Sequence, residues 1–501
     1  MPSPPCERLA DRAVILGVDA GTSVVKAVAF TADGAALRVA GRPTRIVTPA
    51  PGRAEQDLEE VLAAVGDVIR EAAAGEPVDL VGITAQGDGV WLLDGQGRQV
   101  RPPILWSDAR AAPIVTEWLA SGIAERAFRR SGNMLFPGAA APVLAWLQRE
   151  EPASLRRAAT AGYCKDAIMQ RLTGARATDV SDASLPFFNP RAREYDDALL
   201  DLFGLTAWRD LLAPVDPADV WPRPLVAEGA ALTGLPGGTP IHAGPFDLCA
   251  TMIGAGVRET GEGLVILGTT LGCAVLTDRV ETGGEPAGML LCVPEPDRWA
   301  RVMPAMVGTP SLEWVLAMTG TRRDEIDALL GASRPGAAGV VALPFFAPAG
   351  ERAPFVDPAA RGQFLGVSLE STRADLVRAV CEGIGYAVRH CLESAGLADG
   401  ARVLLSGGGG RSAAWRQILA DVLQRPLALA HQPESGARGA ALAALDAARR
   451  EFDAEAWTRP DAVIAPHPRN AQLYDEGFAF YRDRVDAARG HWRGPVFPAE
   501  R

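Results

Sequence analysis

The sequence predicts a mixed α/β protein built from two similar domains. Its 501 residues exceed what one hydrophobic core usually supports. The first hundred residues contain patterns for three strands, one helix and one further strand, which is typical of an α/β domain. A hairpin pattern, in which two apolar runs flank a Gly-Thr turn, occurs at Thr22 and again, almost half the chain later, at Thr269. Two unrelated hairpins are the alternative explanation of that recurrence.

The first domain opens with strands. Residues 14–18 form an apolar run that predicts a buried strand, and residues 24–30 predict its partner across a turn. The turn signal Ala32-Asp33-Gly34 leads to a third strand near residues 37–39. The domain therefore begins with three consecutive strands.

A helix and a fourth strand follow. Asp57, with Glu60 three residues later, is typical of a helix N-terminus. Apolar residues then recur at helical spacing, at positions 58, 61, 62, 65, 68, 69 and 72. Residues 78–83 return to strand character, which completes the α/β pattern.

The second half repeats the hairpin and ends in a helix. The segment EGLVILGTTLGCAVLT, which begins at Glu262, again has an apolar run on each side of a Gly-Thr turn. The stretch GAGVRETGEG, residues 254–263, is rich in glycine and polar residues and fits a domain junction. We therefore expect domains at residues 1–256 and 257–501. Residues 471–488, with aromatic side chains at 474, 478, 480 and 481, predict a closing helix.

Charge and cysteine content narrow the function. A net charge of -11 argues against nucleic acid or an anionic membrane as partner, because such binding depends on clustered Lys and Arg. The seven cysteines are scattered without a CxxC pair, which is typical of buried thiols in a reducing cytosol. The five histidines do not cluster, so no zinc site is expected. The start MPSPPCERLADR lacks the apolar core of an export signal and no run of 18 apolar residues occurs, so we expect a cytoplasmic protein.

The first chemistry-bearing stretch is Asp19-Ala20-Gly21-Thr22-Ser23. A glycine turn between strands lets backbone amides and hydroxyls approach phosphate oxygens, and a carboxylate at a strand end can hold Mg²⁺ through water. A plain tight hairpin is the alternative, in which Lys26 is a solvated strand residue.

The second chemistry-bearing stretch is a glycine-rich loop. In LLSGGGGRSAAWRQILADVL, residues 404–423, a strand runs into four glycines and a helix follows from about Ser412, a natural N-cap. Such a loop suits a nucleotide, because no side chain blocks it and the helix amides point outward. It is neither a P-loop nor a dinucleotide fingerprint. A flexible loop without a ligand is the alternative.

The third and fourth chemistry-bearing stretches each contain a carboxylate in an unusual setting. Asp247 lies among apolar and small residues in HAGPFDLCATMIGAG, where a carboxylate is costly unless it is used or paired. It is a candidate catalytic base, with a helix cap or a salt-bridge partner as the alternative. Gln86, Asp88 and Trp106 follow strand-like runs and could bind sugar hydroxyls. For Asp108 and Arg110 a structural ion pair is favoured.

Together these stretches resemble the FGGY carbohydrate kinase family, within the actin-like ATPase superfamily. The resemblance runs from Ile15 to about residue 446 in the family's order, and six motifs in register carry it. They are DAGTSVVK, LGTT at 267–270, GGGGRSAAWRQILAD, GERAPFVDPAARGQFLGV at 350–367, KDAIMQRLTG with TDVSDAS, and PESGARGAALAA at 433–444.

The resemblance implies two actin-like (ribonuclease H-like) α/β domains around a central cleft. It implies ATP and Mg²⁺ as cofactors, a sugar site and first phosphate motif in the first domain, and a nucleotide site in the second. Asp19 would position Mg²⁺ and Asp247 would be the general base, in contact with the sugar. Gln86, Asp88 and Trp106 would contact the sugar as well. The residues implied to face the nucleotide are Asp19, Gly21, Thr22, Ser23, Lys26, Gly268, Thr269, Thr270, Gly408, Gly409, Gly410 and Arg411.

Two departures from the family bear on the substrate. Val24 stands where many relatives have serine, which removes one phosphate contact. Gly87-Asp88 replaces the Met-His of xylulose kinases and the Arg-Glu of glycerol kinases, and Gly87 is expected to leave room for the acceptor. DAGTSVVKAVAF, AQGDGVWLLD and SDARA look most like the erythritol kinase branch.

We therefore expect a cytoplasmic kinase of a small polyol or ketose, with erythritol first and xylulose or ribulose next, and with a homodimer as one expected assembly. A non-catalytic or chaperone-like actin-fold ATPase is the alternative. An NAD-dependent dehydrogenase is disfavoured, because the glycine-rich loop does not match the dinucleotide-binding fingerprint.

Overall fold

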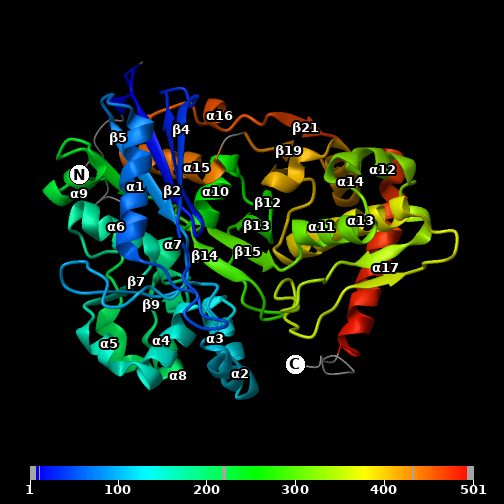
Figure 1. Cartoon of the computed structure of the whole chain (residues 1–501), viewed down its shortest axis with the longest axis horizontal. Helices are drawn as coiled ribbons and strands as arrows, with labels where there is room; N and C mark the ends of the chain where they lie inside the picture. Colours follow the sequence, from blue (N-terminus) through cyan, green and yellow to red (C-terminus); the bar gives the residue numbers. More distant parts are fainter. Residues whose placement is uncertain (1–6, 11, 217–221, 432–433, 493–501) are drawn as a thin grey trace.

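Two large sheets form the framework, one in each half of the chain (Figure 1). The computed structural model describes residues 7–10, 12–216, 222–431 and 434–492. The first sheet has the order β10 (Arg223–Pro224), β11 (Pro240–Ala243), β5 (Leu80–Ala85), β2 (Ile15–Ala20), β3 (Val24–Phe30) and β4 (Ala36–Pro43). The second has the order β14 (Met289–Cys292), β15 (Trp299–Ala305), β13 (Leu271–Thr277), β12 (Gly263–Leu267), β18 (Val403–Ser406), β19 (Leu427–Leu429) and β21 (Ala462–Ile464).

The two sheets share one topology, except that the second carries an additional edge strand, β14, antiparallel to β15. In the first, β2, β3 and β4 are consecutive antiparallel neighbours, and β5 and β11 continue parallel on the other side of β2. In the second, β12, β13 and β15 are antiparallel neighbours, and β18 and β19 continue parallel beside β12. Each sheet ends in an antiparallel strand, β10 or β21. The predicted recurrence of one hairpin per half is therefore confirmed as a repeat of the whole sheet.

Helix α1 (Leu58–Ala73) covers one face of the first sheet. Its N-cap is Asp57, whose carboxylate accepts hydrogen bonds from Glu59 N (2.8 Å) and Glu60 N (3.2 Å), as the sequence predicts. All the predicted apolar positions of α1 are buried. The strand predicted at residues 78–83 is β5, which begins two residues later.

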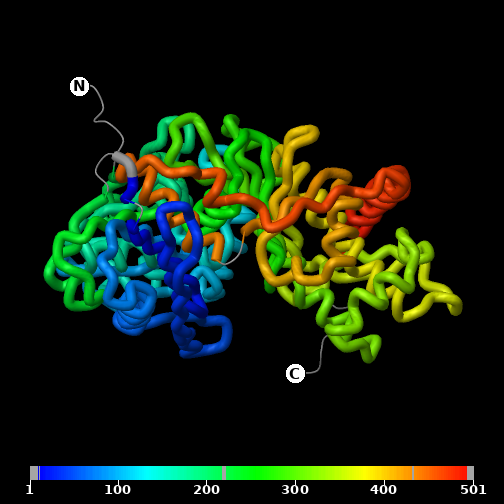
Figure 2. Tube along the Cα trace, turned by 90° about the horizontal axis from the view of Figure 1, so that it is seen from above, coloured from blue at the N-terminus to red at the C-terminus, as the bar shows by residue number. Residues whose placement is uncertain are grey.

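Helix α15 (Ser435–Ala447), from the second half of the chain, covers the opposite face of the first sheet. A Cβ atom at Gly17 would lie 1.9 Å from Ala437 O, and one at Gly82 would lie 2.0 Å from Ala440 O. Glycine in β2 and β5 therefore lets the helix backbone lie directly on the strands. The covering of both faces explains why β2 is a continuous apolar run. In Figure 2 the orange trace of this region lies over the first half, and the red C-terminal helix lies on the second.

Further elements surround the two sheets. In the first half they are α2 (Ala112–Ala120), α3 (Ile123–Ser131), α4 (Ala140–Glu150), α5 (Pro152–Arg157), α6 (Cys164–Thr173), α7 (Val180–Ala183), α8 (Asp197–Phe203), α9 (Ala227–Thr233), α10 (Asp247–Ala255), β6 (Trp91–Leu93), β7 (Thr160–Gly162), β8 (Phe188–Asn189) and β9 (Glu194–Tyr195). In the second half they are α11 (Thr309–Met318), α12 (Ile326–Ala332), α13 (Arg373–Ser394), α14 (Ala413–Leu423), α16 (Ala454–Trp457), α17 (Ala471–Arg489), β16 (Val341–Leu343) and β17 (Gln363–Leu365). β1 (Glu7–Arg8) pairs in parallel with β20 (Arg450–Glu451), so two segments that are far apart in the chain lie side by side.

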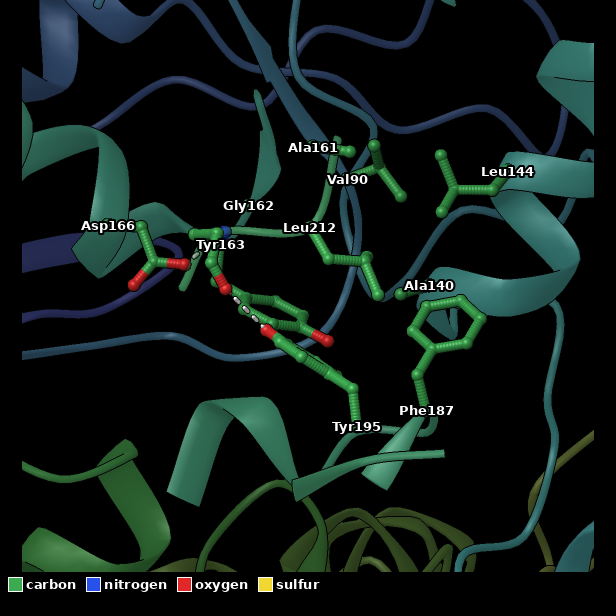
Figure 3. Close-up of a pocket in the computed structure, with 11 residues that line it drawn as sticks. Val90, Ala140, Leu144, Ala161, Gly162, Tyr163, Asp166, Phe187, Tyr195 and Leu212 are labelled. Atoms are coloured by element: carbon green, nitrogen blue, oxygen red, sulfur yellow. Dashed lines mark hydrogen bonds between the residues drawn. The ribbon is translucent and has the colours of Figure 1, made fainter. Parts of the chain in front are cut away.

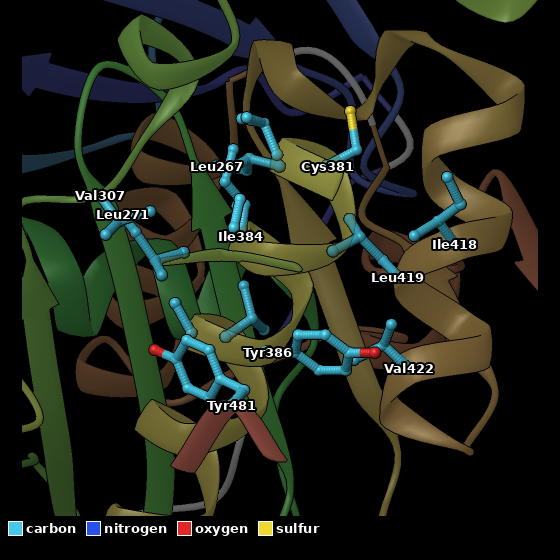
Figure 4. Packing of buried hydrophobic residues seen from close by; sticks show 14 of the residues in the cluster. Leu267, Leu271, Val307, Cys381, Ile384, Tyr386, Ile418, Leu419, Val422 and Tyr481 are labelled. Atoms are coloured by element: carbon cyan, nitrogen blue, oxygen red, sulfur yellow. The ribbon is translucent and has the colours of Figure 1, made fainter. Parts of the chain in front are cut away.

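The core of the second half is built around α13. Figure 4 shows its residues Cys381, Ile384 and Tyr386 between the sheet and α14. The closing helix predicted at residues 471–488 is α17, and it packs on the same core through Tyr474 and Tyr481, which are fully buried. These contacts tie the C-terminal helix to the framework that carries the second hairpin.

Within the described ranges the chain has neither a disulfide bond nor a helix that could span a membrane. The six cysteines in the described ranges are buried and free, as predicted, and Cys6 lies outside those ranges. Among the helices that the structure describes, none combines the length and the apolar character needed to cross a bilayer.

Candidate active site

The predicted carboxylates meet at one edge of the first sheet. Asp19 is near the end of β2, Asp88 follows β5, and Asp247 follows β11 and is the first residue of α10. Because these three strands run parallel, their carboxyl ends lie side by side. The charges of Asp19 and Asp88 both raise the pKa of Asp247, as expected of carboxylates at neighbouring strand ends.

The first turn is fixed by a polar network. Thr22 Oγ1 donates to Gln86 Oε1 (2.7 Å) and accepts from Trp106 Nε1 (2.9 Å). Gln86 Nε2 in turn donates to Gln56 Oε1 (2.7 Å), and Gln56 Nε2 donates to Thr22 O (2.7 Å). Gln86 and Trp106, which the sequence assigns to the sugar, thus bind the turn that is expected to face phosphate. Sequence reasoning missed Gln56, because its partners are far away in the chain.

Asp19 is held against the N-terminus of α15. A Cβ atom at Gly436 would lie 2.4 Å from Asp19 Oδ2, so only glycine leaves space for this carboxylate. Burial raises the pKa of Asp19 to about 6, Glu434 adds to the rise, and Lys26 opposes it. Lys26 lies opposite Asp19 in the hairpin, and its ammonium binds both oxygens of Glu434 (2.9 and 2.8 Å). The Lys26 side chain is nevertheless 38% exposed, so it is a partly solvated strand residue that also pairs with Glu434, and its assignment to the nucleotide stays a prediction.

Asp88 is a buried carboxylate on a left-handed turn. Its φ is +53° and that of Gly89 is +71°, so the chain reverses directly after Gly87. Burial raises the pKa of Asp88 to about 7, Asp182 adds to the rise, and Arg352 opposes it. A Cβ atom at Gly87 would lie 1.6 Å from the ring of Phe246. The expectation that Gly87 leaves room for the acceptor is wrong, because Phe246 fills that space.

Asp247 has the electrostatics of a base. Burial raises its pKa well above the usual range, and the charges of Asp19, Asp182 and Asp88 raise it further. Among the described residues its carboxylate has no ion-pair partner, and a hydrogen bond from the Leu248 backbone amide at the start of α10 offsets part of the rise, so the helix-cap alternative stays open. A carboxyl in such surroundings binds a proton more tightly than one in water.

Lys165 holds the turn that leads to Asp247. This fully buried ammonium contacts Asp179 Oδ1 (2.5 Å), Asp182 Oδ2 (2.8 Å) and Gly244 O (2.6 Å). Next to it, Phe246 N donates to Ser181 Oγ (2.7 Å). The sequence analysis singled out the segments KDAIMQRLTG and TDVSDAS. It did not predict that both pack against the turn that precedes Asp247.

The second-half turn and the glycine loop lie on neighbouring strands. Gly268–Thr270 joins β12 to β13, and Gly268 O accepts a hydrogen bond from Thr309 N at the start of α11 (2.8 Å). Gly407, with φ +95°, leads from β18 into a short 3₁₀ turn at Gly408–Arg411. Ser412 then caps α14 by accepting from Trp415 N (3.0 Å), as predicted. Gly408 is exposed with open space around it.

Contacts at α15 bring this loop near the first turn. Ser406 Oγ, at the end of β18, lies 3.5 Å from Ser435 Oγ, and the next residue, Gly436, packs on Asp19. The glycine loop and the Asp19 turn therefore approach the same helix N-terminus from opposite halves.

Asp108 and Arg110 form the predicted structural ion pair. Arg110 Nε binds Asp108 Oδ1 (2.8 Å), Arg110 Nη2 binds Glu55 Oε1 (2.7 Å), and all three side chains are buried. A separate small cavity has a volume of about 10 Å³, and Figure 3 shows Tyr163 and Tyr195 among the side chains that line it. It has room for about one water molecule, so it is not a sugar site.

The residues present fit a magnesium ion only in part. Within the described ranges no three His, Cys, Asp or Glu side chains are placed to hold a metal together. Mg²⁺ usually takes one or two carboxylates and completes its shell with water and phosphate oxygens. Asp19, whose pKa is raised first by burial and then by the charge of Glu434, is a suitable single ligand of that kind.

Comparisons with known proteins agree along the chain. The model of the N-terminal domain of the FGGY family of carbohydrate kinases matches residues 14–254, and the model of its C-terminal domain matches residues 263–448. Erythritol kinase from Brucella abortus (strain 2308) is 35% identical, over 96% of this chain and 97% of that protein. Xylulose kinase from Escherichia coli (strain K12) is 31% identical, over 81% of this chain and 84% of that protein.

A solved structure has the same fold. The crystal structure of xylulose kinase from Rhodospirillum rubrum aligns with a TM-score of 0.88 at 30% identity, covering 96% of this chain and 99% of that one. The predicted pair of actin-like α/β domains is thereby confirmed. With both family models matched across most of its length, this chain belongs to the FGGY family of carbohydrate kinases.

Proposed function

We propose that this carbohydrate kinase transfers the γ-phosphoryl group of ATP to a hydroxyl of a small neutral polyol, with erythritol as the best candidate and xylulose or ribulose next. The observation that carries the proposal is the convergence of Asp19, Asp88 and Asp247 at one sheet edge, near glycine turns from both halves. The similarity to an erythritol kinase over nearly the whole chain supports the choice of acceptor.

Asp247 acts as the general base. Its carboxylate takes the proton of the attacking hydroxyl, whose oxygen bonds to the γ-phosphorus as the bond to the bridging oxygen breaks and ADP leaves. Its raised pKa makes it a stronger base than an ordinary carboxylate. Lys165 fixes the preceding turn, so Asp247 needs little rearrangement to reach the hydroxyl.

Asp88 binds the acceptor. Its buried carboxylate can accept hydrogen bonds from two neighbouring hydroxyls, and the left-handed turn fixes its direction. Gln86 and Trp106 are assigned to the acceptor in the same proposal, although both also bind Thr22 of the first turn. An acceptor without matching hydroxyls leaves Asp88 unpaired, which is a strong basis for rejection.

The nucleotide is assigned to the two turns and the glycine loop. Gly21, Thr22, Ser23 and Lys26 face the phosphates from the first half, Gly268, Thr269 and Thr270 face them from the second, and Gly408, Gly409, Gly410 and Arg411 line the adenosine. Mg²⁺ on Asp19 would neutralise charge on the phosphate oxygens. Residues 1–256 thus carry the acceptor and the first phosphate motif, and residues 257–501 carry the nucleotide. A cytoplasmic location and a homodimer belong to the same proposal, and size-exclusion chromatography with light scattering tests the dimer.

A coupled ADP-release assay across erythritol, threitol, xylulose, ribulose and glycerol tests the function. We expect the highest kcat/KM with a four- or five-carbon acceptor and little ATP turnover without one. A strong preference for glycerol or a six-carbon sugar would overturn the choice of acceptor. ATP turnover that no acceptor stimulates would instead indicate a non-catalytic or chaperone-like ATPase.

A further inference from the structure

A cavity of about 870 Å³ is lined by residues around both sheets. One wall belongs to the first sheet and the helices beside it, through Pro245 after β11, Ile253 of α10 and Ala443 of α15. Another wall is the loop between β14 and β15 of the second sheet, at residues 294–296. The lining is mostly apolar, and a mostly apolar cavity of this size between two domains is typical of small-molecule sites.

This cavity is distinct from the proposed catalytic site. Asp247 is the first residue of α10, whereas Ile253, which lines the cavity, lies roughly 9 Å further along the helix axis. The three acids Asp19, Asp88 and Asp247 do not line the cavity. A ligand bound there would therefore occupy a second site.

Four carboxylates line the cavity, and two of them are paired within the protein. Asp179 Oδ1 contacts Lys165 Nζ at 2.5 Å. Asp216 Oδ2 contacts Arg223 Nη2, also at 2.5 Å. These two acids are neutralised by cations of the chain and need no ligand for that purpose.

The two arginines in the lining are engaged as well. Arg193 donates from its guanidinium to the backbone oxygens of Val293 and Glu295, which holds the loop between β14 and β15. Arg449 is not free either. The cations in the lining are thus already bound, and they do not point to an anionic ligand.

Asp446 on α15 and Glu295 on the loop between β14 and β15 are the two carboxylates that remain. Among the residues that the structure describes, neither has an ion-pair partner. Burial raises the pKa of Asp446 to about 6, the charge of Glu295 adds to the rise, and Arg258 opposes it. The Arg258 guanidinium itself donates to Ala454 O and Thr458 Oγ1. A cation in the cavity would relieve the repulsion between the two acids.

We propose that this cavity is a second binding site, which takes a small organic amine with an apolar body and pairs its ammonium with Asp446 and Glu295. The apolar body would lie against Ile253 and Ala443. The ammonium would link the helix that covers the first sheet to a loop of the second. An amine fits better than an alcohol, because charged donors form the stronger hydrogen bonds with carboxylates. An anionic ligand would meet two like charges.

Three probes that differ in their terminal group test the preference for a cation. They are 4-phenylbutylamine, 4-phenylbutanol and 4-phenylbutyrate, measured by calorimetry at pH 8, where Asp446 is ionised. The amine should bind roughly 5- to 30-fold more tightly than the alcohol, which is the worth of one or two partly exposed ion pairs. The carboxylate should bind more weakly than the alcohol. Equal affinity of amine and alcohol, or no binding of the amine, would overturn the proposal.

Substitutions separate the two acids from the apolar body. Asp446→Asn and Glu295→Gln should each lower the affinity for the amine by about three- to fivefold, and the double variant should bind amine and alcohol equally. Ala447 is a half-buried residue of the lining, so Ala447→Phe fills part of the cavity. It should weaken amine and alcohol alike, by about tenfold or more. A preference for the amine that survives in the double variant contradicts the proposal, as does undiminished binding to Ala447→Phe.

Two matched controls exclude a general effect of these changes. Asp297 is exposed on the same loop as Glu295 but does not line the cavity, so Asp297→Asn removes a nearby charge only. Ala63 is exposed on α1, so Ala63→Phe adds an aromatic ring to a helix away from the cavity. Both variants should bind the amine as the wild type does. Loss of binding in either would show that the acids and the cavity are not its cause.

Competition separates this site from the catalytic acids and from the proposed function. Neither erythritol nor a non-hydrolysable ATP analogue should displace 4-phenylbutylamine, and Asp247→Asn should bind it as tightly as the wild type does. Displacement by the acceptor, or loss of binding in Asp247→Asn, would place the amine among the catalytic acids and overturn the proposal. Because these are binding measurements, they decide the amine site even if the protein phosphorylates none of the acceptors tested.

Discussion

The two halves share a strand order but carry different chemistry at the ends of corresponding strands. In the first half, β2, β5 and β11 end near Asp19, Asp88 and Asp247, all with raised pKa values. In the second half, β12 and β18 end in the glycine-containing turn and loop, where the described residues include no carboxylate. Under the proposed function, one scaffold would thus supply acids where the acceptor needs a base, and bare backbone where anionic phosphates need amides.

The largest expected effect concerns the acid side. Changing Asp247→Asn removes the base and should lower kcat by roughly 10²- to 10⁴-fold, with ATP binding retained, because the second half is untouched. Steady-state kinetics and calorimetry with ATP measure the two quantities. Asp197→Asn is a suitable control, since Asp197 is likewise the first residue of its helix, α8, but is exposed. Near-normal turnover in the Asp247 variant would remove the acid side of the comparison.

The next effect tests the contact between the halves. In Gly436→Ala the new methyl group would overlap Asp19 Oδ2, so the carboxylate must move. Misplacing a catalytic group by about 1 Å can lower the reaction rate by up to about 10²-fold. We therefore expect Gly436→Ala to lower kcat/KM by roughly 10- to 100-fold. Gly331→Ala, in helix α12 with open space around it, should leave the kinetics unchanged. Equal activity of both variants would show that α15 does not position Asp19.

Local patterns explain which parts of this comparison are predictable from sequence. The hairpins, the Asp57 cap of α1, the Ser412 cap of α14 and the Asp108–Arg110 pair each depend on residues close together in the chain. Their geometry follows from propensity, spacing and turn chemistry, which act over a few residues. The recurrence of one hairpin in each half was predictable because a hairpin is itself a local pattern.

Contacts between distant segments were not predictable in the same way. Phe246 fills the space beside Gly87, Glu434 binds Lys26, and the Arg352 guanidinium lies 5.8 Å from the ring centre of Phe136 in the other half. In each case the two partners are far apart in the chain, and no spacing in a single sequence records their contact. The prediction that Gly87 leaves room for the acceptor was wrong for this reason, because the sequence did not show that Phe246 packs against it.

A smaller effect tests the cost of placing acids on one sheet edge. Burial raises the pKa of Asp88 from 3.8 for an ordinary aspartate to about 7, so the folded state holds the proton more tightly than the unfolded state. Its contribution is neutral below pH 3.8 and becomes destabilising as pH rises toward 7. Asp88→Asn should therefore raise the free energy of unfolding by about 1–3 kcal/mol at pH 8 and change it little at pH 4.

Thermal unfolding at the two pH values, with Asp297→Asn as the control, measures this difference. The melting temperature of Asp88→Asn should exceed that of wild type at pH 8 only. A lower melting temperature at pH 8, or the same shift at both values, would show that the acid edge carries no such cost.

The division of labour between the halves is tested most directly by two-substrate kinetics on one variant from each. Asp88→Ala should raise the KM for erythritol, or for whichever acceptor the panel selects, and leave the KM for ATP nearly unchanged. Gly408→Val places a side chain in open space at the glycine loop, so it should raise the KM for ATP and leave that of the acceptor nearly unchanged. Crossed effects of this kind are the result we predict. If both variants raise the same KM, or if Asp88→Ala leaves the acceptor dependence unaltered, acceptor and nucleotide are not divided between the two sheets as described.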